Sequence, residues 1–201
     1  MASVRPPTVS ALVPDWDAVE TVCLDMDGTV LDLRFDNFFW LEELPRAWGE
    51  ARGLGFDEAF ALLKPRFDAK RGTLEWYCID HWSEELGFDI AELKHRLSGH
   101  IRYLPGAPGF LRGVRELGRR LLLTTNAHPI SLDIKNRRAG LEAHFDELIS
   151  SHGFGAPKES AVFWERPGFC RLWQRTGYCR SPCIGSALGA GRRKPPGPAH
   201  W

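Results

Sequence analysis

The residues with the clearest chemical potential are two aspartates separated by one position, Asp25 and Asp27. Alternate residues of an extended chain point the same way, so both carboxylates can face one site, and Gly28 lets the chain turn tightly behind them. One carboxylate can then attack a substrate while the other transfers a proton. The same stretch also fits an ordinary solvated turn, because Asp and Gly are common turn residues.

The other candidates are Thr125, Asn126 and Lys158, each of which follows a run of apolar residues. Ligands of open α/β sheets bind beyond the carboxyl ends of the strands. We therefore expect these three side chains to meet the two aspartates at one edge of a sheet. A loop lysine taken alone is more typical of the protein surface.

This set of residues predicts phosphate chemistry. A carboxylate that attacks phosphorus forms an acyl-phosphate and splits one difficult hydrolysis into two easier steps. Its negative charge repels the phosphoryl group, so a lysine on one flank and a hard divalent cation with oxygen ligands on the other must offset that repulsion. Mg²⁺ is the expected cation, and a phosphate monoester is the expected substrate.

The first element that must position these residues is the apolar run that ends at Leu24, which indicates a buried strand. After Leu33 the pattern becomes helical. Apolar residues recur at helical spacing in four stretches, at residues 41–51, 56–67, 74–86 and 90–101. They predict an all-helical insertion, in which Pro45 and Pro65 should bend or end the first two helices.

From Pro105 onward, helices and strands alternate. The pattern predicts a helix over residues 110–117, a strand over 120–125, a helix that begins at Pro129, and a short strand over 147–149. Parallel strands need crossover helices between them. The predicted fold class is therefore α/β, with a parallel sheet and a helical insertion after the first strand.

Asp25-Met-Asp-Gly-Thr29 resembles the first motif of the haloacid dehalogenase-like (HAD) hydrolase superfamily, which has the form Asp-x-Asp-Gly-Thr. Four longer stretches are similar to the bacterial GMP/IMP nucleotidase branch of that superfamily. They are Glu20–Trp40, Leu74–Ile90, Leu123–Pro129 and His152–Glu159. The resemblance covers about residues 20–160.

The resemblance implies a HAD-like Rossmannoid core built from residues 15–33 and 104–160. The helical insertion at residues 34–103 corresponds to the family's cap, which closes over the site and excludes water. Residues 161–201 match no part of the family pattern. The core strands that would follow residue 160 are expected to be missing.

The resemblance also implies a role for each catalytic candidate. Asp25 would be the nucleophile and a Mg²⁺ ligand, and Asp27 the general acid and base whose backbone carbonyl also binds Mg²⁺. Thr125, the second residue of a threonine pair, would hydrogen-bond the phosphoryl group, and Lys158 would steady Asp25 and the phosphate. Asp27 favours phosphatase over dehalogenase chemistry, because dehalogenases lack an acid at that position.

A purine 5′-nucleotide is the substrate that the resemblance implies. Asn126, Trp76 and Tyr77 are the predicted substrate-binding residues. A purine needs an aromatic or apolar wall, for which the cap offers Phe35, Phe39, Trp40, Trp76, Tyr77 and Trp82. Each of these aromatic residues also fits packing inside the cap.

The composition is that of an ordinary globular chain. Of its 201 residues, 43% are hydrophobic and 26% are charged, and 26 basic residues balance 26 acidic ones. This balance gives no reason to expect a nucleic-acid or membrane partner. No stretch has the pattern of a signal peptide or a membrane span. We therefore expect a cytoplasmic protein with a small-molecule partner, and the sequence leaves its oligomeric state open.

The C-terminal part of the chain departs from the family pattern. Residues 159–201 hold seven Lys or Arg and two Glu, a net charge of +5, and three of the five cysteines. The family's fourth motif, a strand that ends in an acidic pair and completes the Mg²⁺ shell, has no counterpart after Lys158. We expect residues 161–201 to be irregular, as a frameshifted or degraded end would be. A basic arm that seeks phosphate is the alternative.

Two rival functions stay open on the sequence alone. Loss of the acidic pair would weaken Mg²⁺ binding and positioning, so the chain also fits a catalytically inactive remnant of such an enzyme. The other rival is a HAD phosphatase or phosphomutase that acts on sugar phosphates.

Overall fold

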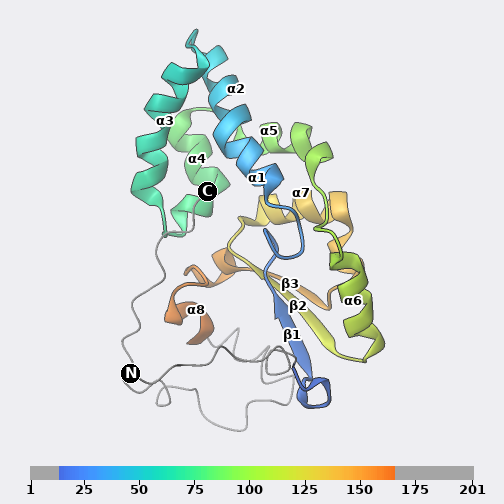
Figure 1. Cartoon of the computed structure of the whole chain (residues 1–201). Coiled ribbons are helices and arrows are strands. Elements are labelled where there is room, and N and C mark those ends of the chain that lie inside the picture. Colours follow the sequence, from blue (N-terminus) through green and yellow to red (C-terminus); the bar gives the residue numbers. More distant parts are fainter. Residues whose placement is uncertain (1–13, 166–201) are drawn as a thin grey trace, which may run out of the picture.

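The computed structural model describes residues 14–165. Its strands are β1 (Thr21–Leu24), β2 (Arg120–Thr125) and β3 (Glu147–Ser150), which form a parallel sheet in the order β1-β2-β3. Figure 1 shows the sheet in the lower half of the molecule, with a group of helices above it. The predicted α/β fold with a helical insertion after the first strand is confirmed.

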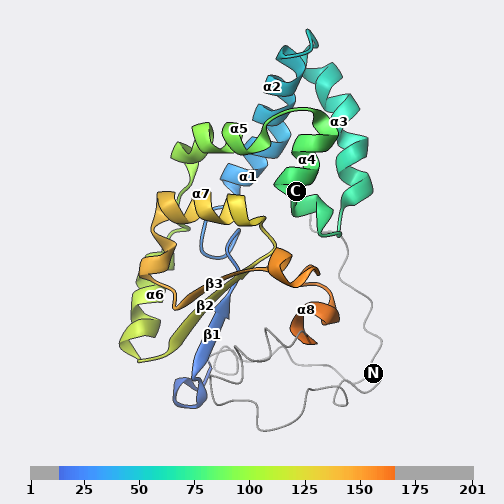
Figure 2. The ribbon, with the colours of Figure 1, turned by 180° about the vertical axis from the view of Figure 1, so that it is seen from behind.

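The two faces of the sheet are covered by different helices. These are α6 (Ala107–Glu116), α7 (Pro129–Ala139) and α8 (Ala161–Glu165). Side chains alternate along β2, so Leu121 and Leu123 pack toward α6 and α7, whereas Leu122 packs with Phe163 of α8 on the other face. Figures 1 and 2 show α6 and α8 on opposite sides of the strands.

The predicted helical insertion lies between β1 and α6. Its elements are α1 (Arg34–Phe38), the π-helical turn η3 (Phe39–Glu43), α2 (Leu44–Glu50), α3 (Phe56–Lys70), η4 (Glu75–Tyr77), α4 (Ile79–Leu86), α5 (Ile90–Leu97) and η5 (Ser98–His100). The helix expected over residues 74–86 is divided at Cys78, whose extended backbone and side chain cap α4. Short 3-10 turns elsewhere are η2 (Trp16–Ala18), η6 (Leu141–Ala143) and η7 (Ser151–Phe154).

The two prolines expected to bend or end the first helices do not end them. Pro45 lies in the first turn of α2, directly after the π-helical turn, which is a common place for helices to absorb such a disruption. Pro65 lies inside α3, which continues to Lys70. Ala59, Leu63 and Phe67 are buried along α3, and this burial offsets the cost of an interior proline, about 3 kcal/mol.

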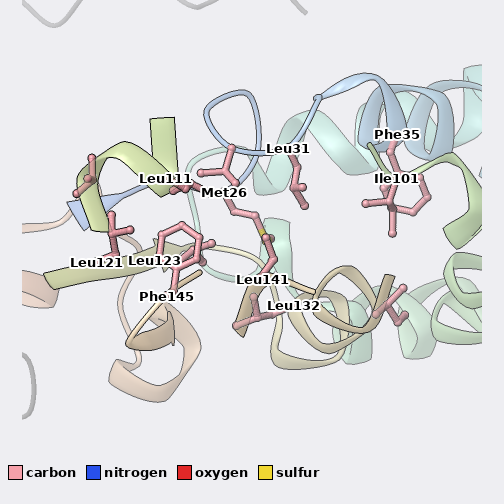
Figure 3. Close-up of a cluster of buried hydrophobic side chains, with 13 residues drawn as sticks. Met26, Leu31, Phe35, Ile101, Leu111, Leu121, Leu123, Leu132, Leu141 and Phe145 are labelled. Atoms are coloured by element: carbon pink, nitrogen blue, oxygen red, sulfur yellow. The ribbon is translucent and has the colours of Figure 1, made fainter. Parts of the chain in front are cut away.

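The buried apolar side chains form three clusters within residues 14–165: one between the sheet and helices α6 and α7, one within the insertion, and a small one around Phe163 on the other face of the sheet. The first includes Met26, Leu31, Phe35, Ile101, Leu111, Leu121, Leu123, Leu132, Leu141 and Phe145, which Figure 3 shows together. The second is made of cap residues such as Phe39, Leu63, Trp82 and Ile90. Phe35 is part of α1 but packs in the first cluster. We propose that the cap begins at residue 34 and ends at 103, with Phe35 holding its first helix to the core.

The sequence predicts an irregular segment from residue 161 onward, and the structure differs over the first five residues of that segment. Residues Ala161–Glu165 form α8, and Phe163 is fully buried against the sheet. A helix that covers an apolar sheet face gains stability from that burial even when it is short. The frameshift hypothesis and the three C-terminal cysteines lie outside the described residues. No helix within residues 14–165 is long and apolar enough to cross a membrane.

Candidate active site

Asp25 follows β1 at the carboxyl edge of the sheet. It leaves 43% of its side chain exposed, and its Oδ1 lies 2.5 Å from Nζ of Lys158. Lys158 Nζ also donates to the backbone carbonyl of Thr124 at 2.9 Å, so it sits between the first two strands of the sheet. The loop that carries Lys158 is supported by α8, because the indole of Trp164 donates to the Lys158 carbonyl at 2.8 Å.

A tight turn presents Asp25 and Asp27 on the side away from Met26. Met26 is fully buried and lies amid the leucines of the core cluster (Figure 3). Its carbonyl accepts hydrogen bonds from the backbone N–H groups of Val30 and Leu31 at 2.9 and 2.8 Å. Gly28 has a φ of 77°, a left-handed conformation that favours glycine. Because the chain reverses direction at this turn, Asp25 and Asp27 line the same cavity.

Asp27 is the first member of a buried network of ion pairs in which acidic and basic side chains alternate. Lys135 on α7 lies 2.6 Å from Asp27 and 2.6 Å from Asp36 on α1, and Asp36 lies 3.1 Å from Lys94 on α5. Only 2% of either lysine side chain is exposed. Lys94 Nζ also lies 4.3 Å from the ring centre of Phe39, a cation–π contact. This network joins two cap helices to the core.

The network sets the protonation of its members. Burial, and then the neighbouring charge of Asp36, raise the pKa of Asp27 to about 6, although Lys135 opposes this shift. Burial acts against ionised Asp36 too, but the two lysines outweigh it and hold its pKa well below the usual range. Burial lowers the pKa of Lys94, whereas the two carboxylates beside Lys135 raise its pKa despite burial. Asp27 is thus the carboxylate of this network that can take up a proton near neutral pH.

Thr125 and Asn126 follow directly from β2. The Thr125 hydroxyl accepts a hydrogen bond from the Ala127 backbone N–H at 3.0 Å and lines the cavity. The side chain of Asn126 accepts from the Lys158 backbone N–H at 2.8 Å and donates to both carboxylate oxygens of Glu159, at 3.0 and 2.8 Å. Asn126 therefore fastens the Lys158 loop to the end of β2.

All the predicted site residues line one cavity of about 440 Å³. The core supplies its polar floor, and the cap supplies an aromatic wall of Trp40, Phe60, Phe67, Trp76 and Tyr77. Burial raises the pKa of Tyr77, while a hydrogen bond with the Asn126 side chain opposes that shift. Phe35 instead packs in the first apolar cluster, and Phe39 and Trp82 pack in the second, so the packing interpretation holds for them.

The oxygen donors at the floor of the cavity fit a hard divalent cation. Lys158 contacts Oδ1 of Asp25, which leaves Oδ2 for another partner. Carboxylate and backbone oxygens are the ligands that Mg²⁺ prefers. The sequence predicts no counterpart of the family's acidic pair after Lys158. Glu159, the residue next to Lys158, lines the cavity.

Sequence reasoning missed Lys135, Asp36 and Lys94. The available signal was the position of the lysines on apolar helix faces. Lys94 lies four residues after Ile90 and three before Leu97, so helical spacing places it on the buried face. A charged residue on such a face must be paired, and this requirement predicts an acidic partner without saying which one.

The sheet, the inserted helices and the aspartate pair at the end of β1 define a class of hydrolase. The profile of haloacid dehalogenase-like hydrolases matches residues 22–172, and the chain belongs to this family. Two curated relatives, the GMP/IMP nucleotidases YrfG of Escherichia coli (strain K12) and Shigella flexneri, are each 42% identical over 149 residues, which are 74% of this chain and 67% of the relative. A crystal structure of a HAD phosphatase from Thermococcus onnurineus shares the fold, with a TM-score of 0.65 and 21% identity over 79% of this chain and 72% of that one.

Proposed function

We propose that this chain is a Mg²⁺-dependent phosphomonoester hydrolase that forms an aspartyl-phosphate on Asp25 and takes a purine 5′-nucleotide such as GMP or IMP. The observation that carries the proposal is the ion pair of Asp25 and Lys158 on the floor of a cavity with an aromatic cap wall. The names of the two nucleotidase relatives support the substrate class.

In the first step, a carboxylate oxygen of Asp25 attacks phosphorus and the bond to the nucleoside 5′ oxygen breaks. Lys158 lies where it offsets the charges of the carboxylate and the phosphoryl group. Thr125 accepts a hydrogen bond from Ala127, which leaves its own proton free to donate to a phosphoryl oxygen. Mg²⁺, held by Asp25 and the backbone carbonyl of Asp27, supplies further charge neutralisation when bound.

Asp27 moves the protons of both steps. It protonates the departing 5′ oxygen, then accepts a proton from the water that hydrolyses the aspartyl-phosphate. A pKa raised to about 6 suits both tasks at neutral pH. Lys135 Nζ holds Oδ1 of Asp27 at 2.6 Å, so we assign the mobile proton to Oδ2.

The cap supplies the site for the base. Trp40, Trp76 and Tyr77 offer flat apolar surfaces on which a purine can stack. Lys64 and Arg71 of the cap region line the same cavity and both pair with Asp68, so these three residues together leave a net positive charge for an anionic substrate. Closure of the cap over a bound nucleotide keeps bulk water from the aspartyl-phosphate.

Phosphate release from GMP, IMP and a panel of hexose phosphates at millimolar Mg²⁺ tests the proposal. Asp25→Asn should reduce kcat for the purine nucleotides by at least about 10⁴-fold. Asp133→Asn, which changes an exposed carboxylate on α7, is the matched control and should be neutral. Equal background rates in the wild type and Asp25→Asn would identify an inactive remnant, and a preference for hexose phosphates would favour the sugar-phosphate alternative.

A trapping experiment tests the covalent step. Asp27→Asn retains Asp25 but removes the base that activates water, so the acyl-phosphate should accumulate with an aryl phosphate that needs no acid. Acid-quenched protein should gain the mass of one phosphoryl group on the peptide that contains Asp25, and hydroxylamine should remove it. Absence of that mass in Asp27→Asn, with phosphate still released, contradicts the mechanism.

A further inference from the structure

Three potential metal ligands from distant parts of the chain meet beside the phosphate cavity. Cys78 caps α4 in the inserted helices, His128 caps α7 after β2, and His152 lies in η7 after β3. One ligand atom of each residue lies within 4.8 Å of those of the other two. Their neighbours Tyr77 and Asn126 line the cavity. The cluster therefore stands at the seam between cap and core, where residue 78 meets the loops after β2 and β3.

The imidazole of His152 is arranged as metal-binding histidines usually are. The backbone of Asn126 accepts a hydrogen bond from its ring, while Nε2 is buried and has no hydrogen-bond partner within residues 14–165. Buried polar atoms are normally satisfied, so this nitrogen points to a missing partner. A ring that donates one N–H to a backbone carbonyl presents a lone pair on its other nitrogen, as zinc-bound histidines do.

The other two residues offer compatible donors. The ring of His128 lies 4.9 Å from that of His152, nearly perpendicular to it at 84°. Burial lowers the pKa of His128 and lowers the pKa of His152 to about 4, so both imidazoles are neutral, which is the form that binds metal. The Cys78 sulfur accepts a hydrogen bond from the His81 N–H at 3.4 Å, so its lone pairs face the start of α4.

Two imidazoles and one thiolate favour Zn²⁺ and disfavour Mg²⁺, which prefers oxygen ligands. Typical Zn–N and Zn–S bonds place tetrahedral donors about 3.3–3.6 Å apart, so small side-chain rotations bring the cluster to that spacing. Asp80 of α4 lies 3.5 Å from Nε2 of His128 and is exposed. Its carboxylate or a water can take the fourth position.

We propose that Cys78, His128 and His152 bind one Zn²⁺ at the seam between cap and core. One ligand belongs to the cap and two belong to the core, so the ion ties the two together. A tied cap slows substrate entry and product release, and Zn²⁺ thereby inhibits turnover. This last consequence rests on the proposed phosphatase function, whereas the binding site itself does not.

Zinc affinity of the full chain, measured by competition with a chromophoric chelator, tests the site. Cys78→Ser and His152→Ala should each weaken Zn²⁺ binding by at least about 100-fold. Co²⁺, used as a spectroscopic probe, should show a thiolate charge-transfer band that Cys78→Ser abolishes. Cys23→Ser, which changes a cysteine on β1 outside the cluster, is the matched control and should keep both the affinity and the band.

Equal Zn²⁺ affinity in the wild type, Cys78→Ser and His152→Ala overturns the site. An ion bound by the C-terminal cysteines would bind all three proteins with the same affinity, and this equality distinguishes it from an ion bound at the cluster. With GMP at saturating Mg²⁺, added Zn²⁺ should lower kcat of the wild type and leave that of Cys78→Ser unchanged. Tight zinc binding with unchanged wild-type kcat overturns the inhibitory tie. If the wild type has no GMP turnover, the proposed function fails, and the affinity measurements still decide the site.

Discussion

Two aspartates two residues apart stand in very different surroundings. Asp25 leaves 43% of its side chain exposed and pairs with Lys158 from a core loop. Asp27 leaves 22% exposed and joins a buried run of alternating charges that starts at Lys135. The two residues are of the same type and follow the same strand, so any difference in their chemical roles comes from their surroundings.

The two sides also differ in what holds them. The ion-pair partner of Asp25 within residues 14–165 is Lys158 of the core, whereas the network around Asp27 includes Asp36 and Lys94 from the inserted helices. The protonation of Asp27 therefore depends on the docked cap. Variants at Lys135 and Lys158, compared for their free energy of unfolding and for kcat, test this contrast.

The largest expected effect on stability belongs to Lys135→Met. Methionine keeps the volume of the buried stem but leaves Asp27 and Asp36 facing each other without their shared cation. Breaking such a buried network typically costs about 3–5 kcal/mol, so the free energy of unfolding in urea should fall by that amount at pH 7. The deficit should shrink as pH falls, because protonation removes the buried negative charges.

Arg137→Met is the matched control for Lys135→Met. Arg137 lies on the same helix and pairs with Asp133, but 71% of its side chain is exposed. Its removal should change the free energy of unfolding by less than about 0.5 kcal/mol. Similar losses in the two variants would contradict a special role for the buried network.

Lys158→Met should show the opposite behaviour. Asp25 is partly exposed and can be rehydrated, so the free energy of unfolding should fall by less than about 1 kcal/mol. The variant lacks the cation beside the attacking carboxylate, and kcat for GMP should fall by about 10²–10³-fold. Lys70→Met, which removes a surface pair with Glu75, should leave kcat unchanged. A stability loss as large as that of Lys135→Met would erase the contrast between the two sides.

Asp36→Asn should change the pH dependence of turnover without touching the reacting groups. The charge of Asp36 helps to raise the pKa of Asp27, so its removal lowers that pKa and also leaves Lys135 to pair with Asp27 alone. Since Asp27 must be protonated to release a nucleoside, the alkaline limb of kcat/KM should move to lower pH. Activity on that limb falls roughly tenfold for each unit the pKa drops. An aryl phosphate with a good leaving group should show little shift, and equal shifts for both substrates would contradict the assignment.

The convergence of Asp25, Thr125 and Lys158 could be predicted from the sequence. Each follows a strand, and the carboxyl ends of parallel strands lie at one edge of the sheet regardless of how the connecting helices pack. The pairing of Lys135 with Asp27, 108 positions apart, could not be predicted in the same way. It exists because α1, α5 and α7 dock together, and periodicity shows which face is buried without showing what meets it. The cluster of Cys78, His128 and His152 escaped prediction for the same reason.

The smallest expected effect falls on Trp76 of the cap wall, which lines the cavity. Trp76→Ala removes a stacking surface from the cavity, while the Trp76 carbonyl still accepts the hydrogen bond of Trp82 at 2.9 Å. Loss of base stacking should raise KM for GMP about five- to tenfold, equivalent to about 1–1.4 kcal/mol, with kcat little changed. Ribose 5-phosphate, which has no base, is the control substrate and should keep its KM. If KM rises equally for both substrates, Trp76 shapes the cavity and does not contact the base. If kcat falls and the alkaline limb of the pH profile of kcat/KM shifts, the cap wall and the Asp27 network are coupled.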